Sequence, residues 1–505
     1  MTGTLPKFGD GTTIVVLGAS GDLAKKKTFP ALFGLYRNGL LPKNVEIIGY
    51  ARSKMTQEEY HERISHYFKT PDDQSKEQAK KFLENTCYVQ GPYDGAEGYQ
   101  RLNEKIEEFE KKKPEPHYRL FYLALPPSVF LEAANGLKKY VYPGEGKARI
   151  IIEKPFGHDL ASSRELQDGL APLWKESEIF RIDHYLGKEM VKNLNILRFG
   201  NQFLSAVWDK NTISNVQISF KEPFGTEGRG GYFNDIGIIR DVIQNHLLQV
   251  LSILAMERPV TFGAEDIRDE KVKVLRCVDI LNIDDVILGQ YGPSEDGKKP
   301  GYTDDDGVPD DSRAVTFAAL HLQIHNDRWE GVPFILRAGK ALDEGKVEIR
   351  VQFRDVTKGV VDHLPRNELV IRIQPSESIY MKMNSKLPGL TAKNIVTDLD
   401  LTYNRRYSDV RIPEAYESLI LDCLKGDHTN FVRNDELDIS WKIFTDLLHK
   451  IDEDKSIVPE KYAYGSRGPE RLKQWLRDRG YVRNGTELYQ WPVTKGSSFE
   501  TDAKL

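Results

Sequence analysis

A run of nine residues, 181–189, concentrates side chains that could do chemistry, in the order Arg-Ile-Asp-His-Tyr-Leu-Gly-Lys-Glu. It supplies a carboxylate at Asp183, an imidazole at His184 and an ammonium at Lys188. Together these groups suit acid–base chemistry beside a bound anion. The run lies where a strand-like segment, 178–182, gives way to a helix-like one, 187–199, and loops at the ends of buried strands often carry converging polar groups. The alternative is a solvated turn with ordinary surface charges.

A second set of reactive side chains falls on a long helical pattern, residues 234–256, whose apolar residues form one stripe. It carries Asp241 and His246, and a histidine in such a place is either a structural residue or a general base. In an α-helix, five residues at about 100° each place these two side chains roughly 140° apart. Asp241 therefore does not orient His246, and Asp183 is the natural carboxylate to do so.

The elements that must position these groups begin with an apolar, β-branched segment, residues 12–17, which leads through a glycine turn into a helical pattern. In this context a Gly-x-x-Gly motif can bind a dinucleotide, although it lacks the third glycine of the common fingerprint and also fits a tight structural turn. Lys25, Lys26 and Lys27 crowd the first helical turns, where cations indicate a nearby phosphate. The residues predicted to bind the cofactor at this turn are Gly18, Ala19, Ser20, Gly21, Asp22, Leu23, Ala24 and Lys25.

A second strand-like segment, residues 45–50, predicts which dinucleotide binds. In a doubly wound fold the residue just past this strand meets the adenosine ribose: an acid accepts from its free hydroxyls, and an arginine binds a 2′-phosphate. Arg52 occupies this place. The sequence therefore predicts NADP rather than NAD, unless Arg52 is only a solvent-facing arginine.

Two further strand-like segments, residues 119–125 and 148–153, continue the predicted sheet. Three successive isoleucines in the second segment indicate a strand buried on both faces, as a parallel sheet requires. Lys154 and Pro155 follow at its carboxyl end, where ligands bind in open α/β sheets. This turn is either a binding site or a strand end marked by an ordinary trans proline.

The run at 181–189 resembles the substrate-site signature of the glucose-6-phosphate dehydrogenase family, in its NADP-dependent eukaryotic form, and the resemblance extends from Gly18 to about Trp491. It implies oxidation of D-glucose 6-phosphate at C1 to 6-phospho-D-glucono-1,5-lactone, with reduction of NADP+ to NADPH. This is the first oxidative step of the pentose phosphate pathway. No metal is implied, and a homodimer or homotetramer is expected.

The resemblance assigns roles to individual residues. His246 is the implied general base, and Asp183 holds its tautomer and stabilises the imidazolium. Lys154, before a cis proline, is implied to contact both cofactor and substrate, and Tyr122 to contact the cofactor. The implied substrate-binding residues are Lys154, His184, Tyr185, Leu186, Gly187, Lys188, Glu222, Asp241 and Lys340, of which His184, Tyr185, Lys188 and Lys340 form the phosphate clamp.

One position departs from the family pattern. Some members carry an arginine shortly after the equivalent of Lys340, whereas this chain has Gly345 followed by Lys346. One phosphate contact is then either missing or supplied by another residue. Many animal members also bind a second, structural NADP, and the residues here that match that site in part are Arg337, Lys346, Arg350, Arg372, Gln374, Tyr380, Lys382 and Trp491.

Beyond residue 186 the pattern changes: one alternating strand-like segment precedes the long helical pattern at 234–256, and the later strand-like segments follow one another without intervening helices. Together these segments are residues 215–222, 314–324, 334–337, 347–353, 369–374, 378–383 and 398–403, which predicts a large, mostly antiparallel sheet. Residues 291–312, rich in Asp, Gly and Pro, are predicted to form a long loop or lid. The expected architecture is an α/β Rossmann-like NADP-binding domain, residues 1–185, followed by an α+β domain, residues 186–505, for substrate binding and oligomerisation.

Composition bounds the possible partners and location. The 505 residues carry a formal net charge of −5, so no excess of basic charge indicates nucleic acid or an anionic membrane. Cys87, Cys277 and Cys423 lie far apart and fit a reducing compartment better than a disulfide framework. The N-terminal residues form no apolar signal segment, and no stretch approaches ~18 uninterrupted apolar residues. We therefore expect a cytoplasmic protein.

Two rival hypotheses are kept beside this one. Another NADP-dependent sugar oxidoreductase with the same two-domain layout would oxidise an unphosphorylated sugar at least as well. A catalytically silent NADP-binding regulator that kept the fold would lack the base, whereas Asp183 and His246 are both present.

Overall fold

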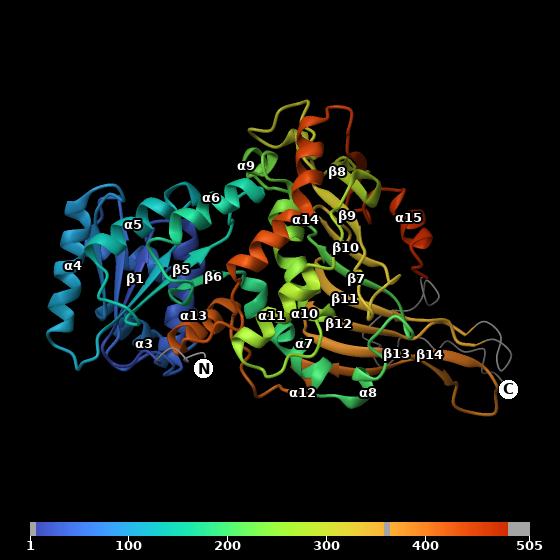
Figure 1. The fold of residues 1–505 in the computed structure, drawn as a ribbon, viewed down its shortest axis with the longest axis horizontal. Helices are drawn as coiled ribbons and strands as arrows, with labels where there is room; N and C mark the ends of the chain where they lie inside the picture. The colour runs from blue at the N-terminus through green and yellow to red at the C-terminus, as the bar shows by residue number, and fades with distance from the viewer. Residues whose placement is uncertain (1–6, 358–363, 483–505) are drawn as a thin grey trace.

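Two sheets organise the structure, a computed structural model that describes residues 7–357 and 364–482 (Figure 1). A six-stranded sheet, sheet A, belongs to the N-terminal part of the chain, and a nine-stranded sheet, sheet B, belongs to the C-terminal part. Figure 1 shows a group of helices between the two sheets. In the part of the chain that is described, no helix combines the length and the apolar character needed to cross a membrane.

Sheet A is parallel throughout, with the strand order β3-β2-β1-β4-β5-β6. Its strands are β1 (Thr12–Leu17), β2 (Glu46–Ala51), β3 (Thr86–Gln90), β4 (Tyr118–Leu123), β5 (Ala148–Glu153) and β6 (Ile179–Ile182). This is the order of a doubly wound dinucleotide-binding sheet, whose switch point lies between β1 and β4. The predicted Rossmann-like unit is confirmed, and β3 is an additional strand that was not predicted.

Helices cover both faces of sheet A, which explains why its strands are apolar along their whole length. In β1, Val15 and Leu17 belong to one apolar core, and Ile14 and Val16 belong to another. The first core contains α4 (Ala96–Glu110) and α5 (Phe130–Tyr140), and the second contains α1 (Phe29–Arg37), α2 (Gln57–Ser65) and α3 (Asp73–Glu84). With both faces buried, the polar groups of this unit collect at the carboxyl ends of the strands.

Sheet B has the order β14-β13-β12-β11-β7-β10-β9-β8-β15. Its strands are β7 (Ile213–Lys221), β8 (Val286–Ser294), β9 (Phe317–Leu322), β10 (Phe334–Gly339), β11 (Lys346–Phe353), β12 (Glu368–Gln374), β13 (Ser378–Lys386), β14 (Asn394–Thr402) and β15 (Glu460–Tyr464). Only the β7–β10 and β8–β15 neighbours are parallel, so the predicted antiparallel character is confirmed. Strands β8 and β15 were not predicted, and β8 runs into the segment expected to be a loop.

The helices between the sheets include the one that carries His246. They are α7 (Glu189–Phe199), η5 (Ile239–Leu247), α10 (Leu248–Ala255), α11 (Ala264–Leu275) and α14 (Asn434–Glu453). The predicted single helix over residues 234–256 is wrong, because residues 239–247 form a π-helix and α-helical geometry returns only at Leu248. The element that holds the candidate base therefore has an uncommon hydrogen-bond register.

One C-terminal helix returns to the N-terminal unit. α13 (Ala415–Lys425) packs against α1, and Gly34 of α1 makes room for it, since a Cβ there would lie 1.9 Å from the Glu417 carboxylate. Phe8 N also donates to Leu424 O at 2.9 Å. Because a late segment of the chain packs on the early unit, the division at residue 185 stays a prediction.

Candidate active site

A carboxylate and an imidazole meet where the carboxyl edge of sheet A contacts η5. Asp183 follows β6 and caps a short helix, η4 (His184–Gly187), by accepting a hydrogen bond from Tyr185 N at 2.9 Å. Its Oδ1 also lies 2.5 Å from His246 Nδ1, although the two residues are 63 positions apart in sequence. Their side chains are only 2% and 4% exposed. This contact leaves His246 Nε2 as the nitrogen that can take a proton.

Burial and charge set the protonation of this pair. Burial acts to raise the pKa of Asp183, but the facing His246 outweighs it and the Asp183 pKa is held at about 2. Burial lowers the pKa of His246 below its usual value, and Asp183 opposes this only in part. At neutral pH, Asp183 is therefore ionised and His246 is neutral, which is the state that accepts a proton.

The π-helix brings Asp241 to the same wall as His246. Hydrogen bonds in a π-helix run from residue i to residue i+5, so residues five apart lie nearly above one another. The α-helical geometry expected for this segment, with the two side chains turned far apart, is therefore wrong. Both side chains line one cavity, although the imidazole pairs with Asp183.

The cavity in front of His246 has a volume of about 700 Å³. Of the predicted residues, Lys154, His184, Tyr185, Lys188, Glu222, Asp241 and His246 line it. Lys154 Nζ donates to the main-chain oxygen of Asp241 at 2.6 Å and lies 3.3 Å from the Asp241 carboxylate. The turn after β5 is thereby joined to η5 across the cavity.

Two lysines of the predicted phosphate clamp differ in their charge partners. Lys340 does not line the cavity directly and pairs with Glu222 at 2.5 Å. Lys188 Nζ lies 5.1 Å from the centre of the Tyr185 ring, and within the described residues it has no ion-pair partner. Burial lowers the pKa of Lys188. A half-buried ammonium without a counter-ion is a ready partner for a phosphate dianion.

Leu186 and Gly187, both predicted to contact the substrate, do not line the cavity. Leu186 is buried in the apolar core. Gly187 lies beneath α13, where a Cβ would come within 2.5 Å of the Ala415 oxygen. Their evident contribution is to let η4 turn under α13, and a substrate contact by either residue stays a prediction.

The glycine turn after β1 has the shape that a dinucleotide requires. Gly18 has a φ of +78°, and a Cβ there would lie 2.2 Å from a main-chain oxygen after β4, so only glycine fits. Ser20 is hydrogen-bonded at 3.1 Å to the loop that follows β2. On that loop Arg52 is exposed, with its guanidinium 5.7 Å from the Tyr93 ring. The glycine turn and Arg52 are thus neighbours, as the pyrophosphate and 2′-phosphate of one NADP require.

The three lysines after this turn separate. They lie on η1 (Ala24–Thr28), which is a second π-helix. Lys26 and Lys27 line the cavity in front of His246, whereas Lys25 lies 5.5 Å from the Tyr67 ring. The sequence grouped all three with the cofactor phosphates, whereas the structure places two of them at the cavity in front of His246. Of these two, Lys26 is already paired with Asp22 at 3.0 Å.

Sequence reasoning missed two groups behind and beside the cavity. Glu153 accepts a hydrogen bond from the Tyr122 hydroxyl beneath the Lys154 turn, and burial raises the pKa of Glu153 to about 7. The Tyr122 hydroxyl is therefore committed to Glu153, and its contact with the cofactor stays a prediction. Tyr416 of α13 lines the cavity, with its ring nearly parallel to that of His184 at 5.9 Å. Glu153 could have been found from sequence, because it stands in the Glu-Lys-Pro turn. No local sequence signal points to Tyr416.

Asp183, His184 and His246 also bring three possible metal-ligand atoms within 4.8 Å of one another. The direct hydrogen bond between Asp183 and His246 is the arrangement of an acid–base pair, and an ion between them would have to break it. Burial lowers the pKa of His184 well below its usual value, so this imidazole is neutral. The expectation that no metal is required stays a prediction.

A second group of cations lies on strands β10, β11, β12 and β13 of sheet B. Arg350 is 2.7 Å from Glu348 and 2.6 Å from Glu368, and Lys382 is 3.1 Å from Glu368. Burial acts to raise the pKa of Glu348, but Arg350 outweighs it and holds this pKa at about 2. We call this group the sheet B cluster; its members are Arg337, Lys346, Glu348, Arg350, Glu368, Arg372, Tyr380 and Lys382.

Two residues predicted to share that second site are not found in the cluster. Gln374, at the end of β12, lines the cavity in front of His246. Trp491 lies outside the described residues. Within the cluster, Arg337 is half-buried, and its buried Nε has no hydrogen-bond partner in the part of the structure that is described.

The fold and the site together define a dinucleotide-dependent oxidoreductase: a doubly wound sheet with a glycine turn, joined to a buried acid–base pair that faces a cation-lined cavity. The family model for the C-terminal domain of glucose-6-phosphate dehydrogenase matches residues 195–491. The model for the NAD binding domain of the same family matches residues 15–193. The chain belongs to the glucose-6-phosphate dehydrogenase family.

Known relatives cover almost the whole chain. Glucose-6-phosphate 1-dehydrogenase of Emericella nidulans is 61% identical over 492 residues, which span 97% of this chain and 96% of that protein. The enzyme of Aspergillus niger is 62% identical, over 96% of this chain and 95% of the relative. A solved structure of glucose-6-phosphate dehydrogenase in complex with its substrate glucose-6-phosphate superposes with a TM-score of 0.91 at 58% identity, covering 95% of this chain and 99% of that one.

Proposed function

We propose that this protein is an NADP-dependent glucose-6-phosphate 1-dehydrogenase, which oxidises D-glucose 6-phosphate at C1 to 6-phospho-D-glucono-1,5-lactone. The observation that carries this conclusion is the buried Asp183–His246 pair facing the same cavity as Lys188, a cation without an ion-pair partner in the described structure. The cavity therefore contains both a group that can remove a proton and a cation that can hold a phosphate. Relatives with this name share the sequence over nearly its full length.

His246 is the group that moves the proton. Its Nε2 accepts the proton of the C1 hydroxyl, while Asp183 keeps Nδ1 protonated and stabilises the imidazolium that forms. As the O–H bond breaks, a C=O bond forms at C1, and the C1–H bond breaks with its electron pair. NADP+, when bound, supplies the acceptor for that hydride. The oxygen thus loses its proton to His246, C1 loses a hydride, and the lactone remains.

The other lining residues hold the sugar phosphate for this step. Lys188 is the proposed phosphate ligand, and His184 and Tyr185 beside it complete the anion site. Glu222 and Asp241 offer carboxylate oxygens that accept from sugar hydroxyls. Charged and polar groups line the cavity and would fix the orientation of the sugar. Fixing the substrate in a reactive orientation lowers the barrier to proton and hydride transfer.

The residues present fit NADP as the cofactor. The close approach at Gly18 leaves space that any larger residue would fill, as a pyrophosphate cradle requires. No acid stands at the position of Arg52 to accept from a free ribose hydroxyl, and its guanidinium is exposed beside the turn that carries Ser20. Arg52 would hold the 2′-phosphate, and Lys154, at the end of β5, would stand between cofactor and sugar.

The experiment that tests the proposal mixes the purified protein with NADP+ and glucose 6-phosphate at neutral pH and follows the absorbance of reduced nicotinamide. A rise that requires the phosphorylated sugar is expected. Equal rates with unphosphorylated glucose would favour another sugar oxidoreductase of the same layout. Binding of NADP without turnover would favour a silent regulator.

We further propose that the sheet B cluster binds a second NADP molecule. It gathers five cations, and Arg337 keeps a buried N–H group without a partner among the described residues. A phosphate oxygen could accept a hydrogen bond from this group. Equilibrium dialysis should count two NADP molecules per chain, falling to one in Arg337→Ala. One per chain in the unaltered protein would contradict the proposal.

We also propose a homodimer or homotetramer built on the free edge of sheet B. Strand β14 is the last strand on that side, and Leu399 on it is 63% exposed. An exposed apolar edge strand invites pairing with another copy of the chain. Sedimentation velocity should show an oligomer that Leu399→Asp weakens, whereas Val260→Asp, at a loop residue that is even more exposed, should leave it intact.

We also propose that the protein is cytoplasmic and catalyses the first oxidative step of the pentose phosphate pathway. Cys87, Cys277 and Cys423 are all free thiols, which suits a reducing compartment. Fractionation of the source cells should recover the glucose 6-phosphate-dependent reduction of NADP in the cytosolic fraction. Recovery in a sealed organelle would contradict the location without contradicting the activity.

A further inference from the structure

A single side-chain amide bridges the π-helical turn that separates Asp241 from His246. Asn245 Oδ1 accepts a hydrogen bond from His246 N at 2.7 Å, and Asn245 Nδ2 donates to Arg240 O at 3.0 Å. The opposite amide orientation would set a donor against the N–H and an acceptor against the C=O, so chemistry allows only this one. The amide thus ties the main chain of the base to the main chain one wide turn earlier.

The same turn presents a main-chain acceptor to the cavity. Lys154 Nζ lies closer to the Asp241 carbonyl, at 2.6 Å, than to the Asp241 carboxylate, at 3.3 Å. The helix is therefore held at two points of the site, by Lys154 at Asp241 and by Asp183 at His246. Both contacts require residues five apart to face the same wall, which is a property of the π register.

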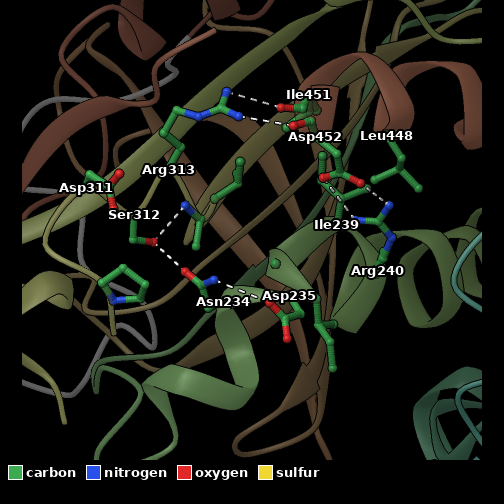
Figure 2. A pocket seen from close by; sticks show the side chains of 15 residues that line it. Asn234, Asp235, Ile239, Arg240, Asp311, Ser312, Arg313, Leu448, Ile451 and Asp452 are labelled. Carbon is green, nitrogen blue, oxygen red and sulfur yellow. Dashed lines mark hydrogen bonds and ion pairs between the residues drawn. The ribbon is translucent and has the colours of Figure 1, made fainter. Parts of the chain in front are cut away.

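The outer side of the helix is anchored by other bonds. Figure 2 shows the pocket on that side, about 410 Å³ in volume, with Arg240 reaching toward Asp452 of α14. The Arg240 guanidinium lies 2.6 Å from Asp452, and its Nε donates to His158 O at 2.9 Å. These bonds fix where the helix begins, but they leave its internal register to Asn245.

We infer that Asn245 is a positioning residue for proton transfer: its amide holds the π register that sets His246 against Asp183 and Asp241 against Lys154. π-helices are rare and occur mostly at functional sites. Without the amide bridge, the segment is free to return to the α register, in which these side chains stand roughly 140° apart and one of the two contacts is lost. The inference rests on the proposed function and concerns a residue that does not line the substrate cavity.

The test compares Asn245→Ala with the unaltered protein. We expect kcat to fall about 10- to 100-fold, since a misplacement of roughly 1 Å can cost about 10²-fold. The acid limb of kcat/KM should also move to lower pH, because His246 loses Asp183, which acts to raise its pKa. KM for glucose 6-phosphate should change less than kcat, because the phosphate ligand Lys188 lies on another element, although Asp241 lies on the same π-helix. The matched control is Asn195→Ala, a half-buried asparagine of α7, which should change neither quantity.

A second variant keeps the test decisive if the alanine variant does not fold. Asn245→Asp preserves the shape and the acceptor for His246 N but sets an oxygen against Arg240 O, so an intermediate loss of kcat is expected. A kcat within a factor of a few of the unaltered protein would overturn the inference. A loss that only follows the folded fraction measured by circular dichroism, with an unmoved acid limb, would also overturn it. Absence of turnover in the unaltered protein would instead refute the proposed function.

Discussion

Two regions of the molecule gather cations, and they differ in what neutralises them. In the cavity in front of His246, Lys188 has no ion-pair partner in the described structure. In the sheet B cluster, Arg350 and Lys382 are held by Glu348 and Glu368, each only 1% exposed. The cavity leaves a charge for a ligand to neutralise, whereas the cluster supplies counter-charges of its own.

The difference matters because a buried charge is costly unless it is paired. A phosphate that enters the cavity pairs with Lys188 and removes this cost, so the pairing contributes to the affinity for the substrate. In the cluster, an incoming anion competes with carboxylates already in place, and only the surplus of positive charge is available to it. A count of lysines and arginines in the sequence does not separate these two cases.

The largest effect should come from the chemical step in the cavity. His246→Asn removes the base and keeps Lys188, so kcat should fall by about 10²–10⁴-fold, the range of general-base catalysis. KM for glucose 6-phosphate should stay near its original value. Steady-state kinetics across pH would check this, and the residual rate should lose its acid limb. Activity within a factor of a few of the unaltered protein would remove His246 from the mechanism.

In the sheet B cluster, removing a carboxylate should lower the stability of the protein rather than its activity. Glu368→Gln leaves Arg350 and Lys382 buried without their shared carboxylate, and breaking such a pair costs about 3–5 kcal/mol. The urea midpoint should drop clearly, and added NADP should restore more of it than in the unaltered protein. Glu344→Gln is the control, since its partners Lys221 and Lys346 keep Asp343 and Glu348, and it should cost at most about 1 kcal/mol. Equal midpoints for the two variants would contradict the contrast.

A lysine exchange in each region compares them directly. Lys188→Ala should raise KM for glucose 6-phosphate roughly 10- to 150-fold, since a charge-assisted contact to phosphate is worth about 1.5–3 kcal/mol. Lys382→Ala should leave that KM unchanged and lower the urea midpoint instead. Unphosphorylated glucose should respond weakly to both. An equal loss with glucose and its phosphate would show that Lys188 does not bind the phosphate.

Much of the fold could be predicted because it depends on local pattern. Sheet A follows from apolar, β-branched segments that end in glycine or lysine–proline turns, and most of sheet B follows from alternating strands. Strand β15 was missed because it is only five residues long and its sequence, Glu-Lys-Tyr-Ala-Tyr, is largely polar. Strand β8 was missed in part because it runs on into a segment rich in glycine and proline.

The site was less predictable where it depends on register and on distant contacts. Helix propensity does not distinguish a π-helix from an α-helix. Predicting that Asp241 and His246 face the same cavity would have required knowledge of the hydrogen bonds made by Asn245 and Lys154. Tyr416 reaches the cavity because α13 packs back on α1, which no short pattern announces. The cavity residues predicted from sequence stood in local patterns: His184, Tyr185 and Lys188 in one run, Lys154 in the lysine–proline turn, and Asp241 and His246 in the helical pattern.

Arg52 extends the comparison to a cation that is exposed and forms no ion pair within the described residues. It is exposed on the loop after β2, beside the turn that carries Ser20, so solvent screens any contact that it makes. If Arg52 binds the 2′-phosphate, Arg52→Ala should narrow the preference for NADP over NAD by only about 5- to 10-fold, below the effect at Lys188.

The measurement is kcat/KM for both cofactors at two ionic strengths. NAD has no 2′-phosphate, so its value should hardly change, and the effect on NADP should shrink at the higher salt concentration because exposed charges are screened. Lys54→Ala, an exposed cation on the same loop, is the control and should leave the ratio in place. A constant ratio in Arg52→Ala would make Arg52 an ordinary surface arginine. Selectivity would then have to come from the turn at Ser20 and Lys25, where the main chain approaches the cofactor.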